Sequence, residues 1–152
     1  GDHMIIDRRE LYNANGWRIE GVIDHDQDSR PDESDCYSAE DIAAWKADRW
    51  QYVNVGARVY LHGVLLGEDW LGGVESGQLA EVECDPFELV PAEYGEVQGM
   101  RSVTMPSAMT GVVLEAVAEA RAFLDKITGA RPELAAIERT FDPNNPEGGE
   151  AS

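Results

Sequence analysis

The chain has few basic residues, and this scarcity sets the first limits on its function. Twelve Lys and Arg stand against 30 Asp and Glu, which gives a formal net charge of −18. Nucleic acids and anionic membranes are held mainly by Lys and Arg side chains that neutralise phosphate. We therefore expect no direct contact with nucleic acid. We also expect none with a membrane, because no apolar run approaches the roughly 20 residues that a membrane span needs.

Cysteine and histidine are scarce as well. Cys36 and Cys84 are too few and too widely spaced for a disulfide framework or a metal knuckle. We expect both thiols to be reduced, which favours a cytoplasmic protein. Residues 1–4 (GDHM) are typical of a cloning remnant, so His25 and His62 are the native histidines.

The motifs of common enzyme classes are also missing. Nucleophilic catalysis needs a base beside a Ser or Cys, and two native histidines offer few such pairs. The sequence contains no phosphate-binding loop, no Gly-rich dinucleotide fingerprint and no HExxH motif. We expect a protein that is not an enzyme and has no cofactor, with calcium as the one alternative ligand. An enzyme of unknown type, using dispersed carboxylates, remains another alternative.

What the chain does contain is enough for one folded domain. Apolar residues make up 43% of it, an ordinary share for a globular protein. We expect a single α+β domain over residues 5–140. Residues 141–152 are polar and rich in Pro and Gly, which predicts a disordered acidic tail.

The clearest local pattern is the alternation of apolar and polar residues from Tyr52 to Leu61, which is typical of a half-buried strand. His62 and Gly63 suit a two-residue turn, so residues 52–75 are predicted to form a β-hairpin. Residues 17–23 read as a further short strand. The predicted register pairs Leu61 with Val64, Val59 with Leu66, Val55 with Trp70 and, as its one misfit, Ala57 with Glu68.

Two helices are predicted to pack on this small antiparallel sheet. Ser38 is a good cap for a shorter helix over residues 38–50, and acids follow it in the first turn. A longer helix over residues 105–128 carries apolar residues at steps of three and four. Its apolar seam and the apolar face of the hairpin each need a partner. Residues 76–101, interrupted by prolines and glycines, are predicted to hold little regular structure.

The acidic stretch over residues 24–35 has the spacing of a calcium-binding loop. Ser29 stands where such a loop has Gly, and Asp35 is shorter than the usual Glu, so a solvated loop is the competing interpretation. The candidate calcium ligands are the carboxylates of Asp24, Asp26, Asp28, Asp32 and Asp35 and the main-chain carbonyl of Arg30.

The acids are unevenly distributed along the chain. Nine acids and no Lys or Arg lie between Arg58 and Arg101, and residues 20–49 hold ten acids against three bases. If these tracts share a face, they would attract a partner protein with a basic face and repel DNA, and the sharpest form of this hypothesis is a DNA mimic. The alternative is that the acidity serves solubility alone. The residues expected to bind the partner are Asp24, Asp26, Asp28, Asp32, Glu81, Glu83, Asp85 and Glu88, with Tyr52, Tyr60 and Tyr94 as aromatic contacts.

Three segments carry a resemblance to a known group of proteins. Residues 37–45 (YSAEDIAAW), 50–55 (WQYVNV) and 71–75 (LGGVE) resemble a pattern in small uncharacterised acidic proteins of actinobacterial phages, plasmids and integrated mobile elements. The resemblance implies no activity for any residue. What it implies is the context of an accessory protein in a phage or mobile element. The excess of Arg over Lys is consistent with a GC-rich source for such an element.

Overall fold

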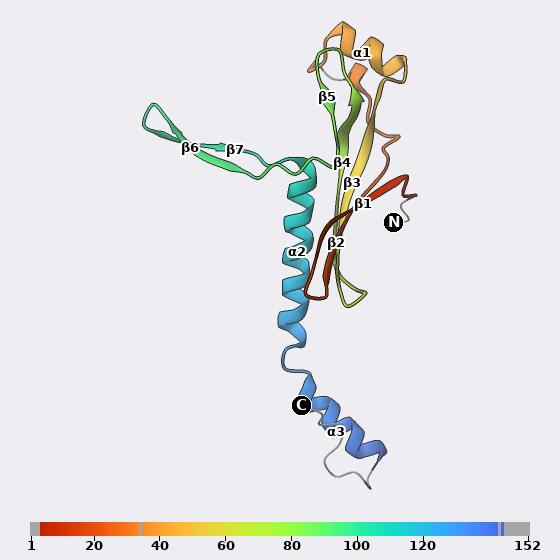
Figure 1. Cartoon of the computed structure of the whole chain (residues 1–152), viewed down its shortest axis with the longest axis vertical. Coiled ribbons are helices and arrows are strands. Elements are labelled where there is room, and N and C mark those ends of the chain that lie inside the picture. Colours follow the sequence, from red (N-terminus) through yellow and green to blue (C-terminus); the bar gives the residue numbers. More distant parts are fainter. Residues whose placement is uncertain (1–3, 34, 143, 145–152) are drawn as a thin grey trace.

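The structure, a computed structural model, describes residues 4–33, 35–142 and 144. Its centre is an antiparallel sheet of five strands whose order in space follows their order in the sequence (Figure 1). Arg9 in the first strand lies over the ring of Phe87, which follows the fifth, so the two edges of the sheet curl towards each other. The predicted α+β class is confirmed. The strands are β1 (Asp7–Ala14), β2 (Trp17–His25), β3 (Trp50–Leu61), β4 (Val64–Gln78) and β5 (Glu83–Cys84).

Tight turns join the first two pairs of strands. Asn15 and Gly16 connect β1 to β2 with φ angles of 55° and 83°, and His62 and Gly63 connect β3 to β4 with 47° and 81°. Positive φ at both central residues matches the right-handed twist of the strands on either side. The predicted hairpin and its turn are therefore confirmed, while the pairing of β1 with β2 was not predicted.

The register of the β3–β4 hairpin differs from the prediction beyond its first two pairs. Leu61 lies opposite Val64 as expected, but the register then shifts, so that Val59 lies opposite Gly67 rather than Leu66. The predicted misfit disappears as a result, because Glu68 now lies opposite Arg58. Arg58 Nε and Glu68 Oε1 are 3.5 Å apart. A β-bulge, which adds one residue to one strand, is the physical reason for the shift.

Helix α2 (Ala108–Ile127) covers one face of the sheet and forms the main core with it (Figure 1). Its buried Ala116 packs close to Gly67 of β4, where a Cβ atom would lie 2.0 Å from the Ala116 carbonyl oxygen. The predicted long helix is confirmed, although it begins at residue 108. Ser107 caps it by accepting from the main-chain N–H of Thr110. The core residues are Ile23, Val53, Val55, Ala57, Val59, Phe87, Met109, Val112, Ala116 and Ala120.

Helix α1 (Ala39–Lys46) packs on residues of β3 that alternate with those facing α2. Trp50 and Tyr52 are buried with Ala44 of the helix, and Trp50 Nε1 donates to the carbonyl of Asp41 over 2.8 Å. Ser38 caps α1 as predicted. The helix is nevertheless shorter than the predicted residues 38–50, because Asp48 takes a left-handed φ of 59° and the chain then enters β3.

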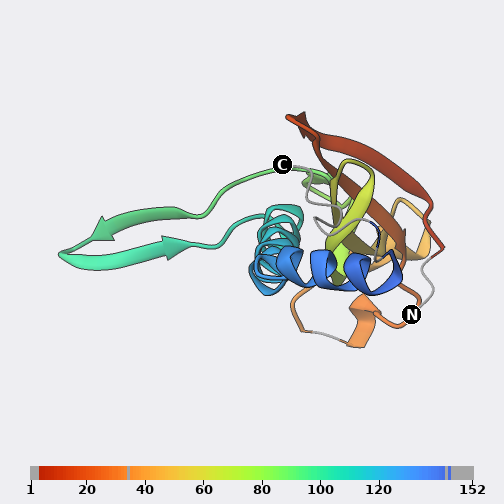
Figure 2. The same cartoon turned by 90° about the horizontal axis from the view of Figure 1, so that it is seen from below.

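The expectation of little regular structure over residues 76–101 is wrong. β4 continues to Gln78, β5 follows, and a second hairpin is formed by β6 (Glu93–Val97) and β7 (Met100–Thr104). Gln98 and Gly99 make its turn with φ angles of 52° and 78°. This hairpin, residues 93–104, is called the arm because it projects away from the sheet and α2 (Figure 2).

The two remaining described helical segments lie outside the main core. A short 3-10 helix, η1 (Pro31–Glu33), precedes α1, and α3 (Arg131–Phe141) extends beyond the lower end of α2 (Figure 1). Among the described residues, no helix is long and apolar enough to cross a membrane. Residues 1–3 of the expected cloning remnant, and residues 143 and 145–152 of the expected tail, lie outside the described residues. The single domain over residues 5–140 remains a prediction.

Candidate functional site

Two acidic segments that are far apart in the sequence lie at one end of the sheet. Residues 24–49 hold nine acids and three bases, and residues 75–88 hold five acids and no base. Together they carry eleven of the chain's eighteen net negative charges. Helix α1 and β5 are neighbours there (Figure 1), and the main-chain N–H of Ala80 donates to Asp41 Oδ1 over 3.0 Å. We call residues 24–49 and 75–88 the acidic end.

Two of the predicted binding acids hold the structure of this end together instead of facing solvent. Asp24 is 7% exposed, and Asn54 Nδ2 donates to its Oδ1 over 2.6 Å. Asp26 Oδ2 accepts from Ser29 Oγ over 2.8 Å and from the main-chain N–H of Gly73 over 2.7 Å. These bonds tie the loop after β2 to the bend in β4. The prediction that Asp24 offers its charge to a partner is wrong, because its carboxylate is buried.

The hydrogen bonds to Asp26 also favour its charged form. Partial burial acts to raise the pKa of the Asp26 carboxyl, but donation from Ser29 and from the main-chain N–H groups of Asp28 and Gly73 outweighs it, so the pKa is lowered. At Asp32, two hydrogen bonds from Arg30 of 3.1 and 2.9 Å lower the pKa in the same direction. Both carboxylates are thus already engaged within the loop.

The other predicted acids are the exposed part of the acidic end. Asp28, Glu81, Glu83 and Glu88 are all exposed to solvent. Asp85 is half-exposed: its Oδ1 accepts from the main-chain N–H of Phe87, and its Oδ2 lies 3.5 Å from Arg9 Nη1. Three further exposed acids of the acidic end, Glu33, Glu40 and Asp48, were not among the predicted site residues, and their charge is the only signal in the sequence that could have identified them.

The three tyrosines expected to contact a partner have three different environments. Tyr52 is 7% exposed and packs edge-on against Trp50 with ring centroids 5.1 Å apart, so its predicted role as an exposed contact is wrong. Tyr60 is half-buried, with the Arg18 guanidinium 4.4 Å from its ring centre. Tyr94 is 81% exposed on the arm, where it remains available to a partner.

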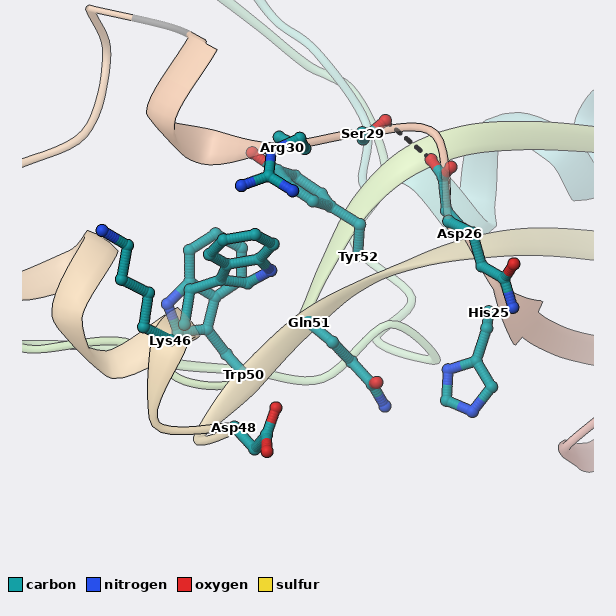
Figure 3. A pocket seen from close by; sticks show the side chains of 11 residues that line it. His25, Asp26, Ser29, Arg30, Lys46, Asp48, Trp50, Gln51 and Tyr52 are labelled. Carbon is teal, nitrogen blue, oxygen red and sulfur yellow. Dashed lines mark hydrogen bonds between the residues drawn. The ribbon is translucent and has the colours of Figure 1, made fainter.

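A cleft of about 460 Å³ opens between the loop after β2 and the end of α1 (Figure 3). Trp45 and Trp50 are among its lining residues, and the Arg30 guanidinium lies 5.0 Å from the centre of the Trp45 ring. The charges of the lining balance in number, because two bases, Arg30 and Lys46, stand against two acids, Asp26 and Asp48. The cleft therefore concentrates charge of neither sign, and its two tryptophans are engaged within the protein, Trp50 by burial and Trp45 by Arg30.

Among the described residues that line the cleft, no nucleophile is aligned with a base. The hydroxyl of Ser29 donates to Asp26, whose oxygens also hold two main-chain N–H groups, so this pair anchors the loop. His25 and Lys46 stand at opposite sides of the cleft (Figure 3). Elsewhere in the acidic end, burial and then the charges of nearby acids raise the pKa of the Cys84 thiol, which keeps it protonated and a weak nucleophile.

The residues of the predicted calcium loop do not converge. Asp24, Asp26 and Asp32 accept hydrogen bonds from Asn54, Ser29 and Arg30, as described above, and Asp28 and Asp35 are exposed. Within the part of the chain that the structure describes, no three His, Cys, Asp or Glu side chains are grouped to hold a metal ion. Calcium binding by residues 24–35, with the Arg30 carbonyl as a ligand, remains a prediction without geometric support.

The arm is the feature that sequence reasoning missed. Every residue of β6 and β7 is exposed except Ser102, which is half-buried. The turn signal Gln98-Gly99 could have indicated a hairpin, but the residues on both sides of it do not alternate, because the apolar ones recur at every third position. At the arm's root, Ser107 Oγ accepts from the main-chain N–H of Val90 over 2.9 Å and donates to the carbonyl of Glu88 over 2.7 Å. The N-terminal cap of α2 is therefore also the anchor of the arm.

Comparison with known proteins finds no match for this chain among protein-family models, curated proteins or solved structures.

Proposed function

We propose that this protein is a non-enzymatic binding protein whose acidic end docks a partner protein with a basic face. The observation that carries the proposal is the concentration of eleven of the eighteen net negative charges in two segments at one end of the sheet. An accessory role in a phage or mobile element, in the cytoplasm of a GC-rich host, is the context that we propose for it.

The exposed carboxylates of the acidic end support charge-steered association. Asp28, Glu81, Glu83 and Glu88 are exposed, whereas Arg30, one of the few bases nearby, is occupied by Asp32. A field of one sign raises the rate at which an oppositely charged partner arrives and repels nucleic acid. A DNA-binding protein is therefore one class of partner, and occupation of its DNA site by these acids would make the protein a DNA mimic.

The proposal is tested by neutralising the acidic end and an equal number of acids elsewhere. The first variant carries D28N, E81Q, E83Q and E88Q, which leave the structural acids Asp24 and Asp26 intact. The matched control removes four exposed acids of α2 and α3 with the same types of substitution, namely E115Q, E119Q, D125N and E133Q. Both variants lose four negative charges, so any difference between them reports the position of the charges.

Binding of each variant to a lysine-rich peptide is measured by fluorescence anisotropy at low and high salt. Four screened contacts of about 0.35 kcal/mol each predict that the acidic-end variant binds about tenfold more weakly, with little change in the control. Affinity of the unchanged protein should fall as salt rises. Equal losses in the two variants would contradict a localised binding surface and favour solubility as the role of the acids. Capture of a partner from a host lysate can then be compared between the same two variants.

A further inference from the structure

The arm presents apolar side chains to solvent on both of its faces. Tyr94 and Val103 lie opposite each other, as do Val97 and Met100. Their exposed fractions are 81% and 56% for the first pair and 61% and 73% for the second. Contiguous exposed apolar side chains on a soluble protein usually mark a contact surface.

An isolated two-stranded hairpin is marginally stable in water, and more strands are needed to make a stable sheet. Among the residues that the structure describes, the sheet of β6 and β7 contains only these two strands, and it projects away from the sheet and α2 (Figures 1 and 2). The hydrogen bonds of Ser107 with Val90 and Glu88 fix its root. The arm is thus held out from the body with both edges available for another strand.

The two edges differ in charge. β6 carries Glu93 and Glu96, whereas the only charged residue of β7 is Arg101. If two β6 strands met edge to edge, they would bring four carboxylates together in a chain that already carries a net charge of −18. Two β7 strands would bring none, so β7 is the edge suited to pairing between identical copies.

The register of the arm shows which main-chain N–H and C=O groups of β7 point to its free edge and can pair with another strand. In a two-residue hairpin the pair that closes the turn, here Val97 and Met100, exchanges hydrogen bonds, and the pattern alternates from there. The main-chain groups of Ser102 therefore face β6, while those of Arg101 and Val103 face the free edge. These outward groups lie symmetrically about Ser102, as pairing of β7 with itself requires.

We propose that β7 pairs antiparallel with β7 of a second copy of this chain, with Ser102 on the two-fold axis. Arg101 of each copy then exchanges main-chain hydrogen bonds with Val103 of the other, and the two arms form one four-stranded sheet. Such a contact is isologous and closes a dimer. It places the acidic bodies at opposite ends of the shared sheet. The proposal rests on the arm alone and is independent of the function proposed for the acidic end.

The first test measures the mass of the full-length protein by sedimentation over a concentration series. The weight-average mass should rise from 16.7 kDa towards twice that value. Val103→Pro removes an outward N–H from β7 and should keep the protein monomeric. Tyr94→Pro is the matched control, because it removes an outward N–H and an exposed side chain from the opposite position on β6 and should leave the dimer intact.

The second test asks whether Ser102 lies on the two-fold axis. In a Cys36→Ser background, Ser102→Cys should form a disulfide-linked dimer under mild oxidation, because residues directly opposite in a non-hydrogen-bonded pair are close enough. Thr104→Cys, two residues further along the same strand, should not cross-link, because its counterpart in the proposed register is Met100.

The outcomes separate this proposal from its alternatives and from the function of the acidic end. Dimerisation should strengthen as salt rises, because salt screens repulsion between the bodies, whereas binding to the acidic end should weaken. A protein that stays monomeric throughout the series overturns the proposal. So does a dimer that survives Val103→Pro, which would place the contact elsewhere, or one that only Tyr94→Pro disrupts, which would place it on β6.

Discussion

The close approach between Gly67 of β4 and the backbone of α2 gives a sharp prediction for stability. A Cβ atom at residue 67 would lie 2.0 Å from the carbonyl oxygen of Ala116 and 2.9 Å from the main-chain nitrogen of Ala120. Both atoms belong to the helix backbone, so no side-chain rotation can relieve the clash. Since ordinary contact begins at 3.4 Å, Gly67→Ala must push the helix away from the sheet by more than 1 Å.

The magnitude follows from what this displacement disrupts. Overpacking a core usually destabilises by about 1–3 kcal/mol, and here the displaced helix also carries Met109, Val112 and Ala116 of the main core. We expect Gly67→Ala to lower the free energy of unfolding by at least about 2 kcal/mol, a large fraction of the roughly 5–15 kcal/mol that stabilises a typical domain.

The assay is urea denaturation at neutral pH, with tryptophan fluorescence as the measure of unfolding. Gly111→Ala is the matched control, because a Cβ atom at residue 111 meets nothing within 4 Å and the residue lies inside α2. There the same substitution should raise stability by about 0.5–1 kcal/mol. A Gly67→Ala protein that unfolds within about 0.5 kcal/mol of the unchanged chain would refute the packing of α2 on β4 described above.

Three further predictions concern the acidic end. Because the folded-state pKa of Asp26 lies below its unfolded value of 3.8, its contribution to stability is present above that value and is lost as pH falls through the folded pKa. The stability difference between the unchanged protein and Asp26→Asn, measured by urea denaturation, should therefore shrink between neutral pH and pH near 3, and a constant difference would contradict it. At mildly alkaline pH a thiol reagent should label the exposed Cys36 quickly and the half-buried Cys84, whose thiol pKa is raised, slowly; two equally fast thiols would be the contrary result. Thermal melting should be the same in millimolar calcium as with a chelator, since the oxygens of residues 24–35 do not converge, and a clear rise in Tm with calcium would restore the calcium interpretation.

The parts of the fold that follow local rules could be predicted from the sequence. Alternation from Tyr52 to Leu61 identified β3, the His62–Gly63 turn identified its hairpin, and Ser38 identified the start of α1. The register could not be predicted, because a bulge is decided by tertiary packing. The predicted pairing of Glu68 with the small apolar Ala57 nevertheless indicates that the simple hairpin register fails along these strands.

Other features depended on contacts that the sequence does not display. Tyr52 lies on the polar side of an alternating strand, yet α1 covers it, so periodicity alone placed it at the surface. From the sequence, Asp24 is expected to be one of the acids that bind a partner. The pairing of β2 with β3 instead brings Asn54 to its carboxylate, which is buried. Local charge therefore indicated the acidic end as a region, while only the fold separates its structural acids from its exposed ones.

The central claim, that a partner with a basic face binds at the acidic end, is tested most directly by hydrogen–deuterium exchange with a lysine-rich peptide bound. The account predicts slower exchange in residues 26–41 and 75–88 and no change in α2 or α3. Protection that spreads evenly over the chain, or that falls mainly on α2 and α3, would contradict it.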